Sequence, residues 1–108
     1  MTRRGKYNNR ITYEDGLCFR SLLEKQRYRE LKLLQHAGDI TNLKIHTRWK
    51  LAVSGVLIAT YEDDFNYVDA QGRLVVEDVK SEATVTPLFK VKSKLMKAVH
   101  NIDIQEVY

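Results

Sequence analysis

The sequence predicts a single α/β domain with the order helix, strand, strand, strand, helix, strand. Three observations predict this order: two helical segments with apolar stripes, a central run of alternating apolar and polar residues, and turn residues between the runs. The 108 residues, of which 44% are hydrophobic and 30% charged, match one globular domain. We therefore assign residues 17–108 to one domain and residues 1–16 to a basic N-terminal arm.

Two segments are expected to form helices. The first should run from about Leu17 to Ala37, because its apolar residues fall on a broad arc at 3.6-residue periodicity and Gly38 suits a C-terminal cap. The second should begin with Thr86 as N-cap and Pro87 in the first helical position, and should end near Asn101. An arc as broad as that of the first helix usually packs against a sheet.

Four segments are expected to form strands. Residues 43–53 alternate in polarity, and Ser54-Gly55 forms a turn before a longer strand over residues 56–68, which can contain a bend. A third strand covers residues 73–80, after the turn sequence DAQG. Residues 102–107 complete the set as a short final strand.

The DAQG turn determines which residues of the second and third strands face each other. Gly72 can take the left-handed conformation of a three-residue hairpin loop, which pairs Asp69 with Arg73. Counting back along both strands places four pairs opposite each other: Val68 and Leu74, Asn66 and Val76, Asp64 and Asp78, and Glu62 and Lys80. The β-carbons of such pairs lie roughly 4.5–5.5 Å apart.

The opposed carboxylates of Asp64 and Asp78 predict a cation site. Like charges directly opposite each other destabilise a sheet, and a half-buried carboxylate is poorly hydrated. Mg²⁺ would offset both effects because it prefers hard oxygen ligands, and the backbone carbonyl of Val79 is close enough to be a further ligand. The alternative is that both carboxylates face solvent and pair with Lys80. A zinc site is not expected, since the one cysteine and three histidines show no ligand spacing.

The sequence combines an acidic helix, then an acid on one strand, a hairpin, and an acid-x-Lys on the next strand. This combination of features resembles the PD-(D/E)XK nuclease superfamily. The stretches "FRSLLEKQRYRELKLLQHAGDITNL", "YEDDFNYVDAQGRLVVEDVKS" and "LFKVKSKLMKA" resemble a small phage-encoded family of uncharacterised proteins within it. That family is grouped with phage endonuclease I and Holliday junction resolvases. The resemblance covers the chain from about residue 17 onward. It implies a restriction-endonuclease-like PD-(D/E)XK core, α-β-β-β-α-β, with a mixed central sheet flanked by helices.

The resemblance implies specific roles for the hairpin residues. Asp64 matches the first acid of the motif, with Asp63 where the superfamily nominally has proline, and Asp78-Val79-Lys80 matches the [D/E]-x-Lys motif. Asp64, Asp78 and the Val79 carbonyl would then hold Mg²⁺ or Mn²⁺ for phosphodiester hydrolysis. Lys80 would contact the phosphate and the attacking water, in an electrostatic role, because neighbouring carboxylates stabilise its positive charge.

The resemblance also implies a carboxylate from the first helix. Ser21-Leu22-Leu23-Glu24 resembles the Ser-x-x-Glu of the first helix in related nucleases, so Glu24 would bind a second metal or orient the attacking water. Glu30 lies deeper in the apolar arc and is a rival for this role. The alternative for Glu24 is a salt bridge at the margin of the arc.

The residues expected to bind DNA belong to three basic sets. Without Arg3, Arg4, Lys6 and Arg10, the 18 lysines and arginines fall to 14 and balance the 14 acidic residues, so the excess positive charge lies in residues 1–10. Each set alone is compatible with a solvated face, but three sets beside an acidic site favour phosphate contacts. The sets are Arg3, Arg4, Lys6 and Arg10 in the arm; Lys44, His46, Arg48 and Lys50 on one face of the first strand; and Lys90, Lys94 and Lys97 on the second helix.

These features predict a metal-dependent DNA endonuclease that recognises branched DNA and acts in phage DNA recombination or processing. Symmetrical cleavage of a junction calls for a two-fold homodimer. Two alternatives remain: a non-catalytic nucleic-acid-binding protein on a nuclease fold, or a phage protein-interaction module that targets a host factor. The unpaired Cys18, the lack of a signal peptide and the lack of a membrane-spanning segment predict a cytoplasmic location, in the host cell if the protein is phage-encoded.

Overall fold

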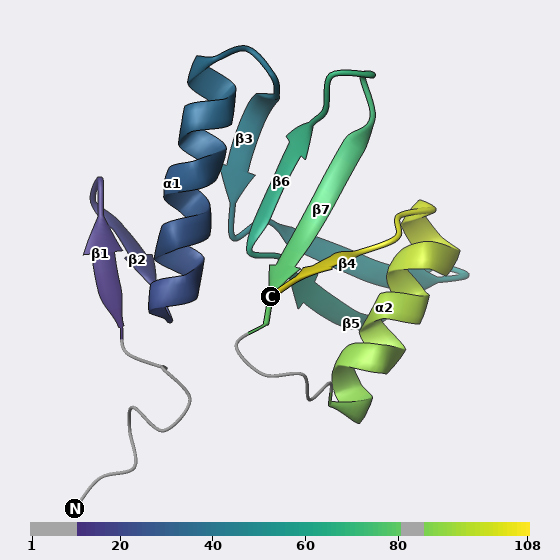
Figure 1. Cartoon of the computed structure of the whole chain (residues 1–108). Coiled ribbons are helices and arrows are strands. Elements are labelled where there is room, and N and C mark those ends of the chain that lie inside the picture. Colours follow the sequence, from purple (N-terminus) through teal and green to yellow (C-terminus); the bar gives the residue numbers. More distant parts are fainter. Residues whose placement is uncertain (1–10, 81–85) are drawn as a thin grey trace, which may run out of the picture.

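A computed structural model describes residues 11–80 and 86–108 (Figure 1). It confirms an α/β fold with two helices and a mixed sheet. Its main sheet has four strands in the order β3-β6-β7-β8, and β4 and β5 form a separate two-stranded ribbon. The elements are β1 (Thr12–Glu14), β2 (Leu17–Phe19), α1 (Leu22–His36), β3 (Thr41–Ile45), β4 (Arg48–Val53), β5 (Val56–Glu62), β6 (Phe65–Val68), β7 (Leu74–Val79), α2 (Pro87–His100) and β8 (Gln105–Val107).

A β-hairpin precedes the first helix, and the sequence analysis did not predict it. β1 pairs with β2 in antiparallel orientation through a turn at Asp15 and Gly16, whose φ angles are 54° and 75°. Positive φ at both central residues is what a type I′ hairpin turn requires, and Asp-Gly favours it. The predicted helix start at Leu17 is therefore wrong, and the folded part of the chain begins within the arm expected over residues 1–16.

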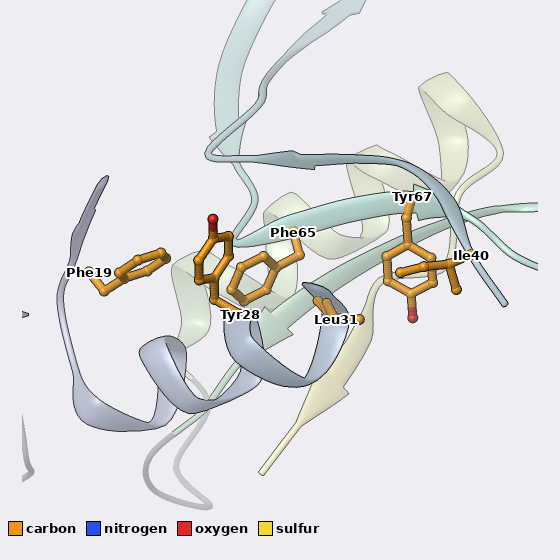
Figure 2. Packing of buried hydrophobic residues seen from close by; sticks show 6 residues of the cluster. All are labelled: Phe19, Tyr28, Leu31, Ile40, Phe65 and Tyr67. Atoms are coloured by element: carbon orange, nitrogen blue, oxygen red, sulfur yellow. The ribbon is translucent and has the colours of Figure 1, made fainter. Parts of the chain in front are cut away.

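Helix α1 covers the β3 side of the main sheet (Figure 1). Ser21 is its N-cap, and the Ser21 hydroxyl accepts a 3.1 Å hydrogen bond from the backbone N–H of Glu24. Its buried face packs a core against the hairpin and β6, in which aromatic rings from three elements meet (Figure 2). The buried residues of this core are Phe19, Tyr28, Leu31, Ile40, Phe65 and Tyr67.

The predicted hairpin between the second and third strands is confirmed as β6 and β7. The N–H of Asp69 donates a 2.8 Å hydrogen bond to the carbonyl of Arg73, and Gly72 has the left-handed φ of 81°. Val68 pairs with Leu74, as the loop geometry predicts. β7 also pairs in parallel with β8, which makes the sheet mixed.

The first two predicted strands are each divided. β3 ends at Ile45 and β4 begins at Arg48, because His46 takes a φ of 53° that ends the extended conformation. The second strand divides into β5 and β6. The first half of the first strand, β3, pairs with β6 in the main sheet, and its second half, β4, pairs with β5 in the ribbon. The predicted pairing of Glu62 with Lys80 is therefore wrong, since Glu62 pairs with Arg48 in the ribbon.

Helix α2 packs on the β4–β5 ribbon (Figure 1). As predicted, Thr86 is its N-cap, Pro87 lies in its first turn, and Asn101 ends it in the left-handed conformation. A second core of Leu51, Tyr61, Val76 and Met96 joins the helix, the ribbon and β7. Among the described residues, neither helix has the length and apolarity needed to cross a membrane.

Candidate metal and nucleic-acid site

A cavity of about 460 Å³ lies where the start of α1, the bend between β5 and β6, the end of β7 and the start of α2 come together. Three of the predicted catalytic carboxylates, those of Glu24, Asp64 and Asp78, line it. Its other lining residues are Arg20, Ser21, Tyr61, Glu62, Val79, Thr86, Leu88, Phe89 and Lys92.

Asp64 and Asp78 reach the cavity from adjacent segments, but they have different partners. The Asp64 Oδ2 atom accepts a 2.6 Å hydrogen bond from the backbone N–H of Val79. Asp78 accepts a 2.7 Å hydrogen bond from the Tyr61 hydroxyl through Oδ2, and its Oδ1 lies 2.9 Å from the Lys80 Nζ atom. Both carboxylates are largely buried, so the solvent-facing part of the alternative is wrong, whereas the ion pair with Lys80 that it predicted is present for Asp78.

Of the two helix acids that competed in the sequence, Glu24 is the one at the cavity. It lies in the first turn of α1, and its side chain is 7% exposed. Glu30 is 64% exposed and forms an ion pair with Arg27 on the outer surface. Glu24 lies at the N-terminal end of the helix, where the helix dipole favours its negative charge.

The bend that presents Asp64 is held by its fully buried neighbour Asp63. The Asp63 carboxylate accepts hydrogen bonds from the Thr47 backbone N–H (2.9 Å), the Trp49 indole N–H (3.0 Å) and the Asn66 amide (2.8 Å). Burial raises the pKa of Asp63, which these hydrogen bonds partly oppose. Asp63 therefore holds together the break between β3 and β4 and the bend between β5 and β6.

The strand division brings one unpredicted residue, His46, into the site. One ligand atom each from Glu24, His46 and Asp64 lies within 4.8 Å of the others. Among the described residues, the buried Oε1 of Glu24 and Nε2 of His46 have no hydrogen-bond partner. Two buried atoms that lack hydrogen-bond partners and lie beside a further carboxylate could act as ligands of a metal ion. Sequence spacing did not indicate His46 as a ligand, because these three residues are far apart in the sequence and meet only through the fold.

The electrostatics of the site are dominated by burial and by negative charge. Burial, followed by the nearby charge of Glu24, raises the pKa of Asp64 to about 8. Arg20 partly offsets this charge, with its guanidinium 3.6 Å from Asp64 and 3.8 Å from Glu24. Burial, followed by the charge of Asp78, also raises the pKa of Tyr61, so its hydroxyl stays protonated and donates.

The predicted basic sets do not form one surface. Division of the first strand places Lys44 in the main sheet and Arg48 and Lys50 in the ribbon, so the expectation of one continuous face is wrong. Lys90, Lys94 and Lys97 are exposed on α2, and Lys97 lies 3.0 Å from Asp103. Arg3, Arg4, Lys6 and Arg10 lie outside the described residues.

The sequence pattern carries no signal for two basic residues at the cavity. Arg20 and Lys92 line it, although neither belongs to a predicted set. Lys80 is also close, since its Nζ lies 3.4 Å from the centre of the Phe89 ring, and Phe89 lines the cavity. The cavity therefore combines buried carboxylates with cationic groups.

Comparison with known proteins gives one match. A family model described as "Protein of unknown function (DUF1064)" matches residues 4–107. No curated protein and no solved structure matches the chain significantly.

Proposed function

The chain belongs to the DUF1064 family, and we propose that it is a metal-dependent endonuclease that hydrolyses phosphodiester bonds in DNA. The single observation that carries this proposal is that Glu24, Asp64 and Asp78 line one cavity, although they come from a helix, a bend and a strand. Buried carboxylates gathered in this way are unfavourable unless a cation compensates them.

The residues of the cavity fit the requirements of phosphodiester hydrolysis. A divalent ion held there would neutralise phosphate charge and help to activate water. Asp64, Glu24 and Asp78 place carboxylate oxygens, the ligand type that such an ion prefers, around the cavity. The Val79 N–H and the Tyr61 hydroxyl keep the aspartates in place, which preorganises the site before an ion binds.

Cationic side chains around the carboxylates would contact the phosphate. Lys80 is held at 2.9 Å from Asp78 and rests on the Phe89 ring, so its charge is positioned rather than mobile. Arg20 is 65% exposed, and its longer contacts to the carboxylates leave it free to turn toward a phosphate. Lys92, on α2, also lines the cavity.

We further propose that the core is of the PD-(D/E)XK type. If β3 with β4, and β5 with β6, are each counted as one divided strand, the order after the N-terminal hairpin is α-β-β-β-α-β. Asp64 and the Asp78-Val79-Lys80 sequence occupy the bend and the end of β7, where that motif would place its acids and lysine.

The proposed substrate is branched DNA, and the proposed active form is a homodimer. No described helix is arranged like a sequence-reading element, which favours recognition of DNA shape through phosphate contacts. A dimer is supported by the ribbon strand β5, on which Val56, Leu57 and Ile58 are 56–60% exposed. Two copies would place two cavities on one junction.

Incubation of the purified chain with four-way-junction, duplex and single-stranded DNA, and with RNA, tests the proposal. We expect cleavage of the junction with Mg²⁺ or Mn²⁺ and none with a chelator. Binding without cleavage would indicate a non-catalytic nucleic-acid-binding protein. Failure to bind any nucleic acid would contradict the proposal and would favour a protein-interaction module.

A further inference from the structure

We propose that Glu24, His46 and Asp64 bind one divalent transition-metal ion, of which Mn²⁺ is the probe, in preference to Mg²⁺. The inference deepens the proposed function and rests on it for its catalytic meaning. It differs from the set of Asp64, Asp78, Glu24 and the Val79 carbonyl, because it adds an imidazole ligand and leaves Asp78 to Tyr61 and Lys80.

Two buried donor atoms without partners carry this inference. The Glu24 Oε1 and His46 Nε2 atoms lie 3.5 Å apart, and neither makes a hydrogen bond to any described residue. The Glu24 side chain is 7% exposed, so water does not readily satisfy this oxygen. Buried polar atoms of folded proteins nearly always have a partner, and a bound ion is one explanation for an exception.

The backbone holds the three residues together before any ion binds. The His46 N–H donates a 3.2 Å hydrogen bond to the Asp64 carbonyl, which ties the two breaks in the strands to each other. The Ser21 hydroxyl accepts from the Glu24 N–H and fixes the first turn of α1. The ring of Phe19 lies beside the His46 ring, with centroids 6.1 Å apart.

The existing partners of Asp78 keep it from being a ligand of the same ion. Both carboxylate oxygens of Asp78 have close partners, the Tyr61 hydroxyl at 2.7 Å and the Lys80 ammonium at 2.9 Å. Within the described residues, the Asp64 carboxylate accepts one close hydrogen bond, from the Val79 N–H, and its Oδ1 faces Arg20 at 3.6 Å. Asp64 is therefore free to offer an oxygen to an ion, whereas Asp78 would first have to leave Tyr61 or Lys80.

The chemistry of the donors determines the class of metal. Mg²⁺ demands oxygen ligands in nearly ideal octahedral geometry, so an imidazole nitrogen contributes little to its binding. Transition-metal ions such as Mn²⁺ accept mixed nitrogen and oxygen ligands, and a neutral imidazole is the commonest nitrogen donor to them. One imidazole and two carboxylates therefore favour a transition-metal ion.

Mn²⁺ and Mg²⁺ titrations of the purified chain, without nucleic acid, test the inference. Binding of Mn²⁺ is followed by loss of the electron paramagnetic resonance signal of free Mn²⁺, and Mg²⁺ is measured by competition. We expect Mn²⁺ to bind at least about 10-fold more tightly than Mg²⁺. Equal affinities, or tighter binding of Mg²⁺, would overturn the inference.

His46→Asn is the most informative variant, because asparagine tolerates the positive φ of 53° and replaces the nitrogen donor with an amide oxygen. We expect it to weaken Mn²⁺ binding about 10-fold or more and to change Mg²⁺ binding little. His36→Asn, on the exposed end of α1, is the matched control and should bind both ions like the wild type. Unchanged Mn²⁺ binding by His46→Asn would overturn the inference.

A spectroscopic measurement on the wild type keeps the test independent of any folding defect in the variant. Pulsed electron paramagnetic resonance of bound Mn²⁺ should show modulation from a directly coordinated imidazole nitrogen. Absence of this modulation would leave a proton shared by Glu24 and His46 as the better explanation of the two orphaned atoms. Nitrogen-coordinated Mn²⁺ without any cleavage would contradict only the proposed nuclease function.

Discussion

The fully buried carboxylate of Asp63 accepts a 3.0 Å hydrogen bond from the indole N–H of Trp49 in β4. The same carboxylate accepts from the Thr47 N–H, so it ties the bend between β5 and β6 to the break between β3 and β4. Both breaks carry site residues, His46 and Asp64. A residue that does not reach the cavity therefore determines its geometry.

Asp63→Ala should destabilise the protein and impair the site together. It removes the acceptor of the Thr47 N–H and of the Trp49 indole, and one of the two acceptors of the Asn66 amide. Unsatisfied buried donors cost about 1–3 kcal/mol each. We expect the free energy of unfolding to fall by about 2–4 kcal/mol, measured by urea denaturation. Asp39→Ala, at an exposed aspartate, should change it little. Wild-type stability in Asp63→Ala would contradict the role given to Asp63.

Neighbouring acids on β7 should respond in opposite ways to loss of charge. Glu77 is buried and receives two hydrogen bonds from Arg27, at 2.7 and 2.8 Å, on the face away from Asp78. Glu77→Gln leaves the partly buried Arg27 charge without its buried counter-ion, so we expect the free energy of unfolding to fall by about 2–3 kcal/mol. Glu30→Gln removes the exposed partner of the same arginine and is the control, with an effect below about 0.5 kcal/mol.

Asp78→Asn should preserve stability and abolish DNA cleavage. Glu77→Gln should still cleave DNA at temperatures where it is folded. The asparagine retains an oxygen to accept from Tyr61. It loses the charge that faces Lys80, but it also removes a negative charge beside Asp64, and these two effects on stability oppose each other. Thermal unfolding and DNA cleavage of both variants, measured side by side, check this contrast. A loss of cleavage only in Glu77→Gln would contradict this prediction, because it would make Glu77, rather than Asp78, the functional acid of β7.

Metal binding should strengthen as pH rises toward about 8. Burial raises the pKa of Asp64 to about 8, so a proton competes with the cation below that pH, and the affinity should level off above it. Calorimetric titrations with Mn²⁺ at several pH values between 6 and 9 measure this dependence. An affinity that does not change over this range would contradict it.

The same pKa predicts how the metal-free protein responds to pH. Folded Asp64 binds its proton more tightly than the unfolded chain does, so its contribution to stability is present at low pH and is lost as pH rises to about 8. Asp64→Asn, whose side chain carries no charge, should therefore raise the melting temperature at pH 9 and change it less at pH 5. A lower melting temperature of this variant at pH 9 would show that the ionised carboxylate is stabilised by its surroundings.

Self-association should depend on the exposed apolar side chains of β5. Ile58→Lys places a charge among Val56 and Leu57, and we expect it to shift a dimer toward the monomer in sedimentation velocity at DNA-binding concentrations. Val91→Lys, at an equally exposed apolar residue on α2, is the control and should leave the dimer intact. A monomer mass for the wild type would contradict the dimer altogether.

Features encoded by a few adjacent residues could be predicted from the sequence. The Thr86 and Asn101 caps of α2 and the Gly72 turn depend on local backbone preferences, which the residue types reveal. The register of that turn was sufficient to bring Asp64 and Asp78 to the same region. The Asp15-Gly16 turn carried an equally local signal, and the helical composition of the following segment obscured it.

Features that depend on contacts between distant segments could not be predicted. His46 alternates like a strand residue, and only the backbone of the folded chain, with its positive φ, turns it toward Glu24. The hydrogen bond from Tyr61 to Asp78 joins the ribbon to the main sheet, and strand alternation gives no sign of it. The same holds for Asp63, whose three partners lie on both sides of the strand breaks.

Single-turnover cleavage of a four-way DNA junction, with Mn²⁺ or Mg²⁺, by the wild type and Asp78→Asn tests the central claim most directly. The proposed function predicts metal-dependent cleavage by the wild type and a rate at least about 100-fold lower in the variant. Equal cleavage by both proteins, or by the wild type in the presence of a chelator, would contradict it.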